Sequence, residues 1–595
     1  MVPRQPGMTG AEDASPRTEL TDLIRAVQRE SGRQMRLQKG TIGRVGRQAA
    51  RVLSLTHSLR PEPLDRVCPS VEENLDYLKC TLGDSDDVVF RRFRVGGRSG
   101  LQAALVYLDG LVDRASVNRH VLEPVMVRPS TMAVLDRPLD VSFYRQIVLD
   151  ALLSSSEVMV SPSMTRALDQ LLAGEALLFL EGVPEALIIG ARGWADRGIE
   201  EPIGEAVIRG PRDGFGETLR KNTALIRRRI RDPSLRVQSL RVGRRSRTDV
   251  CIVYLEGVAN NRLVGELQER LQQIDVDAVL ESGTIEQLIE SHPWSPFPQL
   301  QTTERPDRVA SAVLEGRVAV LVDGTPMALI LPATFTVFYQ TPEDYYERFL
   351  VATLVRGIRL LALFASLTFT ALYVALVGFH AEMLPTSFAV ALAGARASVP
   401  FPVAVDALLL EVTMEVVREA SVRLPRPIGP TIGIVGTLVI GQALTQAGIV
   451  SPVLVIVVAA TTIASFALPS YSAAIAYRIL KFPVILAAAV LGLYGIMAVL
   501  IVILIHLSAM ETFGVPYLAP AAPLRFSDLK DTVVRSPLWA MRRRPEMLQP
   551  RQAHRMAEQL PRHQPSRPAV ETERQGTTPG PVRLQDGQGH DGGER

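Results

Sequence analysis

The chain has 595 residues, of which 47% are hydrophobic and 21% charged, and its formal net charge is +3. This length allows more than one domain, and so small a net charge excludes the strong positive field typical of nucleic-acid-binding proteins. The three cysteines, Cys68, Cys80 and Cys251, are too few and too scattered for a disulfide framework or a zinc site.

The N-terminal residues 1–64 are rich in Arg, Gln and Gly and show little apolar periodicity. This composition predicts a basic, disordered arm, because such a segment buries too little apolar surface to offset the entropy of ordering. The opening stretch, MVPRQPGMTGAEDASPRTEL, has no apolar run of the kind that a cleavable signal peptide requires. We therefore expect the N-terminal region to lie on the cytoplasmic side.

An internal repeat follows between residues 65 and 345. The heptapeptide Ala-Leu-Val-Tyr-Leu-Asp-Gly at 104–110 returns as Cys-Ile-Val-Tyr-Leu-Glu-Gly at 251–257, an offset of 147 residues from 104 to 251. A second element at 173–184 returns at 315–326, an offset of 142 residues from 173 to 315. Because the two elements keep their order and nearly their spacing, we infer two related subdomains.

The two subdomains, 65–200 and 201–345, are each predicted to hold a β-hairpin. In both, an acidic residue followed by glycine joins two β-rich runs, LLFLEGVPEALII and VAVLVDGTPMALI. This is the turn chemistry of a hairpin. Helical stretches such as Val258–Ile274 lie between the strands. The expected fold class is therefore an α/β or α+β soluble N-terminal region of two related subdomains.

From about residue 346 the apolar residues gather into long runs, which predicts an all-α transmembrane helical bundle over 346–510. Residues 360–379 form a stretch of 20 residues without a charge. At 1.5 Å per residue such a helix crosses the ~30 Å hydrocarbon core of a bilayer. Ser451-Pro452 predicts a tight break between two further spans. We expect about four spans, at 360–379, 431–450, 453–469 and 482–507.

The charges that flank these spans predict the topology. Basic residues precede the first span and follow the last one, so by the positive-inside rule both termini are cytoplasmic, in agreement with an even number of spans. Arg478 and Lys481, in the expected loop 470–481, do not fit this alternation. A further or re-entrant segment near 387–410 would change the count.

The part of the chain that follows the bundle is predicted in two sections. Residues 511–545 are expected to form a cytoplasmic segment. Residues 546–595 are rich in Pro, Gly, Gln and Arg. This composition predicts a disordered tail, because it offers little apolar surface to bury.

The segment 403–424 is predicted to be an amphipathic helix with three acidic residues. Glu411, Glu415 and Glu419 recur at helical spacing, so the helix either lies at the membrane interface or lines a polar cavity. Acidic side chains in a pore attract cations. The alternative is an interfacial helix whose charges sit among the lipid headgroups and pair with one another.

The next span, 431–450, combines glycines with polar side chains. The glycines allow close helix packing or leave room along a conduction path. The threonines and glutamines bring polar atoms that hydrocarbon does not tolerate unpaired. Together they favour a helix that faces an oligomer axis or a cavity. The candidate pore or gating residues are Glu411, Glu415, Glu419, Thr431, Val435, Thr437, Gln442 and Gln446.

The stretch 220–247 is strongly basic. No helix-turn-helix, RNA-recognition or zinc pattern accompanies it, so we expect no nucleic-acid partner. A solvated face or contact with anionic lipid headgroups explains the run.

The sequence contains no GxxxxGK[ST] phosphate loop, no HExxH metal motif and no GxSxG nucleophile elbow. Each of these motifs carries a recognised catalytic or nucleotide-binding chemistry. We therefore expect no enzymatic activity, no catalytic residues, no cofactor and no metal site.

Several motifs in a fixed order resemble one family over about residues 70–545. They include Ile-Arg-Gly-Pro-Arg-Asp-Gly-Phe-Gly-Glu at 208–217, Glu-Asp-Tyr-Tyr-Glu-Arg at 343–348, Gln-Ala-Gly-Ile-Val-Ser-Pro at 446–452 and Arg-Ser-Pro-Leu-Trp at 535–539. Each is weak by itself, but their number and order are specific. The chain resembles the A subunit of GerA-family spore germination receptors.

This resemblance implies a multi-pass protein of the spore inner membrane that works with B and C partner subunits. It implies sensing of small-molecule nutrients, such as amino acids, sugars or nucleosides, and an oligomeric, pentameric channel that releases monovalent cations. The polar segment 403–446 is the matching pore candidate. Two alternatives stay open: a stage V sporulation AF-type paralogue that modulates ion release, and a membrane scaffold without conduction.

Overall fold

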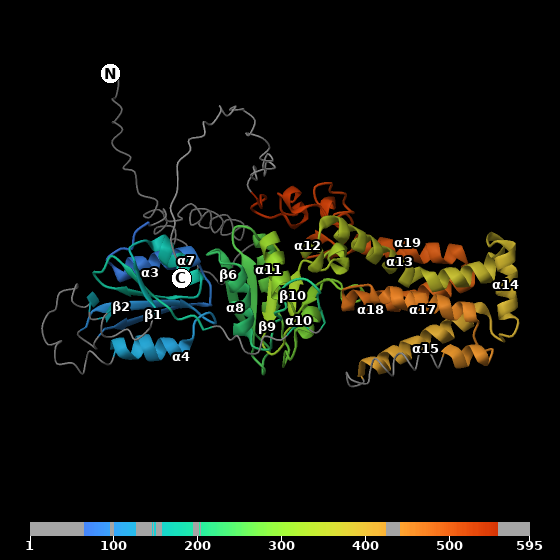
Figure 1. Cartoon of the computed structure of the whole chain (residues 1–595), viewed down its shortest axis with the longest axis horizontal. Helices are drawn as coiled ribbons and strands as arrows, with labels where there is room; N and C mark the ends of the chain where they lie inside the picture. Colours follow the sequence, from blue (N-terminus) through green and yellow to red (C-terminus); the bar gives the residue numbers. More distant parts are fainter. Residues whose placement is uncertain are drawn as a thin grey trace, which may run out of the picture.

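The computed structural model describes residues 65–95, 100–126, 145–146, 148–149, 157–193, 201–202, 204–423 and 441–556. Figure 1 shows three parts in a row, namely a first sheet with its helices, a second sheet with its helices, and an elongated helical region. The predicted N-terminal arm, 1–64, lies outside the described residues.

The first sheet has five antiparallel strands in the order β1-β2-β4-β5-β3. Strands β4 (Ala176–Leu180) and β5 (Ala186–Ile189) are buried at every position, because helices cover both faces. Helices α3 (Val71–Leu82) and α7 (Met164–Leu172) pack on one face, and α4 (Arg114–Val117) packs on the other. The other strands are β1 (Val88–Arg94), β2 (Gln102–Leu108) and β3 (Val158–Ser161).

The second sheet also has five antiparallel strands, in the order β6-β7-β9-β10-β8. Helices α8 (Leu219–Arg229) and α11 (Pro306–Glu315) cover one face. Helices α9 (Asn261–Gln272) and α10 (Ser282–Ile289) cover the other. The strands are β6 (Leu235–Val242), β7 (Thr248–Leu255), β8 (Gln301–Thr303), β9 (Val318–Val322) and β10 (Ala328–Leu331).

The two sheets repeat one strand order, and the repeated sequence elements occupy equivalent strands. The first element contributes to β2 and β7, and the second to β4 and β9. Both predicted hairpins are present, as β4–β5 and β9–β10. Their turns contain Gly182 at φ 80° and Gly324 at φ 86°, a left-handed backbone that glycine adopts without steric cost. The prediction of the hairpins is therefore confirmed.

The basic run 220–247 is only partly a solvated face. Arg227 is buried in an ion pair with Asp87 of the first sheet region, with Nε 2.7 Å from Oδ2. Arg241, Arg244 and Arg245 are exposed and pair with acidic neighbours on the same subdomain. Much of the positive charge is therefore neutralised internally, and Arg227 joins the two sheet regions.

The helical region begins with α13 (Phe349–Phe379), which leaves the second sheet. Helix α14 (Thr386–Arg396) lies at the end farthest from the sheets (Figure 1). Helix α15 (Val403–Arg423) returns beside α13. Helix α17 (Pro452–Phe466) begins directly after Ser451, where the predicted break lies, and packs against α13 and α15.

The remaining helices are α18 (Tyr471–Leu491) and α19 (Leu493–Ala509). Tyr477 of α18 and His506 of α19 both contact Phe297 at the sheet end of the bundle. At the other end Tyr494 contacts His380, which follows α13. The two helices therefore form an antiparallel hairpin that goes away from the sheets and comes back.

The predicted single span 482–507 is therefore wrong, because the chain reverses within it. Gly492 separates the two helices with φ +60°, and a Cβ there would lie 2.6 Å from the His380 ring. The predicted loop 470–481 is also wrong. Ser470 caps α18 by accepting a hydrogen bond from the Ala473 amide, and the helix continues through Pro483. Arg478 and Lys481 are helical residues inside the bundle.

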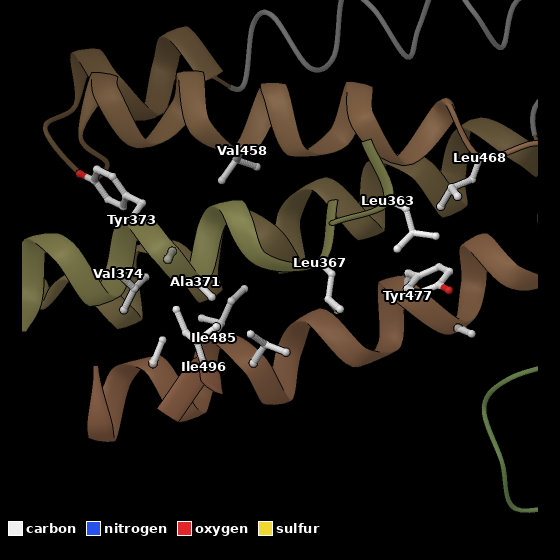
Figure 2. Packing of buried hydrophobic residues seen from close by; sticks show 14 of the residues in the cluster. Leu363, Leu367, Ala371, Tyr373, Val374, Val458, Leu468, Tyr477, Ile485 and Ile496 are labelled. Carbon is white, nitrogen blue, oxygen red and sulfur yellow. The ribbon is translucent and has the colours of Figure 1, made fainter. Parts of the chain in front are cut away.

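A continuous apolar core holds the helices together (Figure 2). Leu367 and Val374 of α13 pack with Val458 of α17 and Ile485 of α18. Helices α13 and α18 are long and apolar enough to cross a membrane, whereas α17 and α19 are apolar but shorter. Of the predicted span 431–450, the part before residue 441 lies outside the described residues.

The segment after α19 folds back onto the second sheet region. It begins with the short strands β11 (Glu511–Thr512) and β12 (Val515–Pro516). The Arg551 amide donates to the Val258 carbonyl at 3.0 Å. Residues 546–556 were predicted as the start of a disordered tail, but they belong to this folded segment because Met547 and Leu548 are buried against Val515 and Ala519. The chain thus enters and leaves the bundle at the same end.

Candidate functional site

A cluster of charged side chains lies inside the helical bundle. Glu411 of α15 is fully buried, and its carboxylate pairs with Lys481 of α18. Thr370 of α13 donates to the other Glu411 oxygen at 2.7 Å, and its hydroxyl lies 3.0 Å from that of Thr461 on α17. Four helices therefore meet at this one carboxylate.

A second acid lies one turn further along α15. Glu415 pairs with Arg478 of α18, and the Arg418 guanidinium lies 3.6 Å from its other oxygen. Arg418 also donates to the Ser465 hydroxyl at 3.2 Å and stacks over the Phe466 ring. We call Glu411, Glu415, Arg418, Arg478 and Lys481 the bundle cluster.

The bundle cluster borders an internal cavity of about 10 Å³, close to the smallest volume that holds one water molecule. The cavity is lined by polar and charged side chains from α13, α15, α17 and α18. Arg478 Nε and Thr462 Oγ1 are buried there without a hydrogen-bond partner among the described residues. The interior of the bundle therefore contains polar groups whose bonding is incomplete.

The structure divides the predicted pore residues into three groups. Glu411 and Glu415 face the interior of the bundle, which favours the polar-cavity interpretation of α15 over a purely interfacial helix. Glu419, Gln442 and Gln446 are exposed, with Glu419 near the C-terminal end of α15 and the two glutamines near its beginning. The remaining candidates lie outside the described residues: Thr431, Val435 and Thr437.

Sequence reasoning missed the cations that hold the two buried acids. Arg478 and Lys481 lie 63 and 70 residues beyond Glu415 and Glu411. Their spacing of three residues within an Ala-rich segment was the available signal, because it places both on one face of a helix. Among the described residues no group of three His, Cys, Asp or Glu side chains is placed to hold a metal ion.

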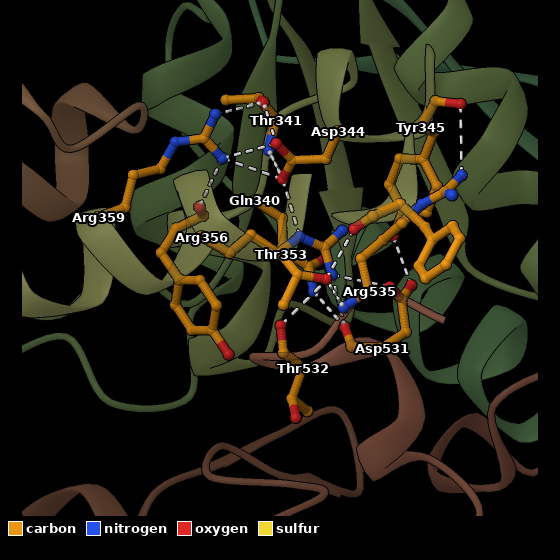
Figure 3. Close-up of polar contacts among 12 residues, drawn as sticks. Gln340, Thr341, Asp344, Tyr345, Thr353, Arg356, Arg359, Asp531, Thr532 and Arg535 are labelled. Carbon is orange, nitrogen blue, oxygen red and sulfur yellow. Dashed lines mark hydrogen bonds and ion pairs between the residues drawn. The ribbon is translucent and has the colours of Figure 1, made fainter. Parts of the chain in front are cut away.

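A second polar network joins the bundle to the second sheet region (Figure 3). Arg356, in the second turn of α13, is fully buried. Its Nε donates to Asp344 at 2.9 Å and its Nη1 donates to Asp531 at 2.7 Å. Asp344 belongs to α12 (Glu343–Tyr346) and Asp531 to the C-terminal segment. We call this set, with Arg359 and Tyr345, the junction network.

Additional bonds extend the junction network, in which Arg356 Nη2 is buried without a hydrogen-bond partner among the described residues. Arg359 donates to both oxygens of Asp344, at 2.8 and 2.9 Å. The Tyr345 hydroxyl donates to Asp531 at 2.6 Å. Burial, together with the adjacent Asp531 carboxylate, raises the pKa of Tyr345 well above its ordinary value, so the hydroxyl stays a donor. The first turns of α13, α12 and the C-terminal segment are thus held together.

Comparison with known proteins identifies relatives over most of the chain. A family model described as Bacillus/Clostridium GerA spore germination protein matches residues 76–547. "Spore germination protein KA" of Bacillus subtilis is 43% identical over 480 residues, covering 81% of this chain and 87% of that protein. "Spore germination protein GerLA" of Bacillus cereus is 42% identical over 479 residues, covering 80% and 95%.

Two further matches are a protein described only as a membrane protein and a solved structure of a single domain. "Uncharacterized membrane protein YfkQ" of Bacillus subtilis is 41% identical over 495 residues, covering 83% of this chain and 94% of that protein. Among solved structures, the N-terminal domain of the A subunit of the Bacillus megaterium spore germinant receptor GerK3 matches with 34% identity and a TM-score of 0.35. That match covers 46% of this chain and 99% of the solved one.

Proposed function

The chain belongs to the GerA family of Bacillus and Clostridium spore germination proteins, and from this we propose that it is the A subunit of a nutrient-sensing germinant receptor. In this proposal the protein resides in the spore inner membrane and works with B and C partner subunits. Several copies, five in our proposal, assemble into a channel for monovalent cations that opens when the receptor binds its nutrient.

Membrane insertion with several crossings is supported by the path of the helices. Helices α13 and α18 are long enough to cross a bilayer, and α18 and α19 form a hairpin with its two free ends near Phe297. The sheets and the C-terminal segment lie at the same end of the bundle. This arrangement agrees with an even number of crossings and with both termini on the cytoplasmic side.

The observation that carries the channel proposal is the bundle cluster. Charged side chains in a membrane-embedded helical bundle are costly, so they mark ion or substrate paths by default. Glu411 and Glu415 are neutralised by Lys481, Arg478 and Arg418 within one subunit. We therefore assign these two acids to gating rather than to the open lining.

The lining itself is assigned to exposed polar side chains at the two ends of α15. Glu419 lies near its C-terminal end, whereas Gln442 and Gln446 lie near its beginning, where Gly448 adjoins Ser398 and Gly441 adjoins Val455. Several copies around an axis would bring the Glu419 side chains together at one end of the path and the glutamines together at the other. Thr431, Val435 and Thr437 complete the proposed lining by sequence. A ring of Glu419 carboxylates would attract cations by electrostatic focusing.

The first test is potassium release from spores with and without this gene. We expect the deletion to abolish release triggered by a particular nutrient, which would also identify the germinant class. Unchanged release with every nutrient would contradict the receptor role. It would favour the stage V sporulation AF-type paralogue or a scaffold.

A second test addresses the lining. Reconstituted full-length protein with Glu419→Gln should conduct cations more slowly, because the ring of negative charge is lost. Glu382→Gln is a matched control, since Glu382 is an exposed acid at the far end of the bundle. Equal flux from both variants would remove Glu419 from the conduction path.

A further inference from the structure

The C-terminal segment presents an exposed apolar surface. Between residues 524 and 543, Phe526 is 75% exposed and Trp539 is 65% exposed. Leu524, Val534 and Leu538 are each at least half exposed as well. Several exposed large apolar side chains within one short segment are typical of a contact with another body. We call residues 524–543 the juxtamembrane segment.

The same segment is basic, and its acidic side chains are directed inward. It contains five basic and two acidic residues. Asp531 bonds Arg356 and Tyr345, and Asp528 accepts from the amides of Glu546 and Met547. Four of the basic side chains make no ion pair within the part of the chain that the structure describes: Arg525, Lys530, Arg542 and Arg543. The outer surface is therefore apolar and positive.

The juxtamembrane segment lies against the first turns of α13. The Arg535 amide donates to the Thr353 hydroxyl of α13 at 3.1 Å, and Asp531 pairs with Arg356. Leu350 and Leu354, on the same first turns of α13, are 70% and 65% exposed. Figure 1 shows the segment, in red, beside α12 at the sheet end of the bundle. Its apolar surface thus adjoins the exposed apolar side of α13.

We propose that the juxtamembrane segment binds the surface of the bilayer, with Phe526 and Trp539 at headgroup level and the basic side chains on anionic lipid headgroups. Aromatic side chains prefer this level because one end of the ring is apolar and the other tolerates water. Basic residues near the cytoplasmic surface are attracted by anionic lipids. The inference rests on the proposed membrane insertion of the bundle.

A lipid surface fits this segment better than a second copy of the chain. Arginine and aromatic residues are enriched in protein interfaces as well as at membrane surfaces, so the position of the segment decides between the two. It lies against the first turns of α13, whose exposed Leu350 and Leu354 adjoin the bilayer in the proposed arrangement. In the juxtamembrane segment, basic and apolar side chains are interspersed along one stretch. An interfacial protein segment has this mixture, because the apolar side chains enter the bilayer while the charges stay among the headgroups.

The test uses the full chain with a single tryptophan, reconstituted into bilayers of phosphatidylcholine and phosphatidylglycerol. The double substitution Trp194→Phe/Trp294→Phe leaves Trp539 as the single tryptophan of the chain. In a control chain all three tryptophans are replaced and Tyr77→Trp places the probe on α3 of the first subdomain. Lipids brominated near the headgroup end of the acyl chain serve as quenchers, and acrylamide serves as the aqueous quencher.

We expect brominated lipid to reduce Trp539 emission and to leave the Tyr77→Trp probe unchanged. The reduction should be larger with phosphatidylglycerol and smaller in high salt, because the attraction is electrostatic. Lys530→Gln/Arg542→Gln/Arg543→Gln should weaken the dependence on phosphatidylglycerol. The matched triple variant Arg241→Gln/Arg244→Gln/Arg245→Gln, exposed on the second subdomain, should not.

Three outcomes would overturn the inference. If acrylamide quenched Trp539 as fully as free tryptophan and bromine did not, the segment would face water. Protection from both quenchers would show that protein, such as a second copy, covers it. Carbonate extraction provides the separate check on insertion: release of the chain from the bilayer would refute the membrane placement itself, whereas retention with an unquenched Trp539 would refute the lipid contact alone.

Discussion

The junction network and the bundle cluster are both built from buried ion pairs, but they are connected differently. In the junction network, Asp344 is shared by Arg356 and Arg359, and Arg356 also reaches Asp531 in a distant segment. In the bundle cluster, Glu411 has Lys481 as its cation and Glu415 has Arg478 in closest contact. The first is an interlocked set and the second is close to two separate pairs.

This difference indicates different roles. An interlocked set resists displacement, because moving one member leaves several buried charges unpaired. A pair beside a small polar cavity rearranges at lower cost, because its groups have other polar partners nearby. We therefore expect the junction to transmit a movement of the sheet regions rigidly to α13, and the bundle cluster to be the element that changes.

The largest effect is expected from removing the shared acid of the junction. Asp344→Asn keeps the size of the side chain but leaves Arg356 and Arg359 without their common partner. We expect the free energy of unfolding to fall by about 3 to 5 kcal/mol, which is typical of an uncompensated buried charge. Thermal unfolding of the full chain in detergent would measure it, and limited proteolysis would detect release of the C-terminal segment.

The control for this change is Glu347→Gln. Glu347 lies close by but forms a partly exposed pair with Arg209 at 3.6 Å, and such surface pairs contribute at most about 1 kcal/mol. If Asp344→Asn destabilised the protein no more than Glu347→Gln, the junction network would not be the rigid joint inferred above.

The next largest effect is expected in the bundle. Lys481→Met leaves Glu411 buried without a cation, but Thr370 still donates to its carboxylate. We expect a loss of about 2 to 4 kcal/mol, somewhat below the junction change. Adding Glu411→Gln should recover most of it, since an ion pair replaced as a whole is often neutral. Thermal unfolding in detergent measures both variants.

The corresponding double change at the junction should behave differently from the double change in the bundle. Asp344→Asn/Arg356→Met would still leave Arg359 and Asp531 without their ion-pair partners, so little recovery is expected. Equal recovery in the two double variants would remove the distinction between an interlocked set and a separate pair.

The sequence could predict those features whose signal lies within a few neighbouring residues. The hairpins at Gly182 and Gly324 were predictable, because turn chemistry is contained in a few residues. The helical spacing of Glu411 and Glu415 placed both on one face of a helix. Their partners on α18 lie more than 60 residues further along, and no pattern in one sequence connects residues at that separation.

Two other features were missed for similar reasons. The reversal at Gly492 was hidden because hydropathy is equally high on both sides of it. Its signal, two glycines in Leu-Gly-Leu-Tyr-Gly at 491–495, is weak in a predicted membrane segment, because glycine is common in membrane helices. Arg356 is one of the basic residues before the first predicted span, and in the sequence those residues served only as a topology signal. Its ion pair with Asp531 joins residues 175 apart, which only the fold brings together.

The smallest effect is expected from a partly buried acid that, unlike the acids of the junction network and the bundle cluster, has no basic partner among the described residues. Glu286 on α10 faces Glu290 and Glu281, and among the described residues no basic side chain pairs with it. Burial, with these two carboxylates, raises its pKa from 4.5 to about 7. The folded state therefore holds the proton more tightly than the unfolded chain does. This contribution to stability is complete below pH 4.5 and is lost as the pH rises through about 7.

Hydrogen exchange of the α10 amides in the full chain, corrected for intrinsic rates, should show this loss. Between pH 5 and pH 8 we expect the opening free energy of α10 to fall by about 1 to 3 kcal/mol. Glu286→Gln should flatten the profile and make α10 more protected at pH 8, because no charge forms. Glu269→Gln, which replaces an exposed acid on α9, should keep the slope. A slope that survives Glu286→Gln unchanged would assign the titration to Glu290, whose pKa burial also raises. In that case the ionised Glu286 carboxylate would not destabilise the fold. The presence of a basic partner would then not explain which buried carboxylates this protein tolerates in their charged form.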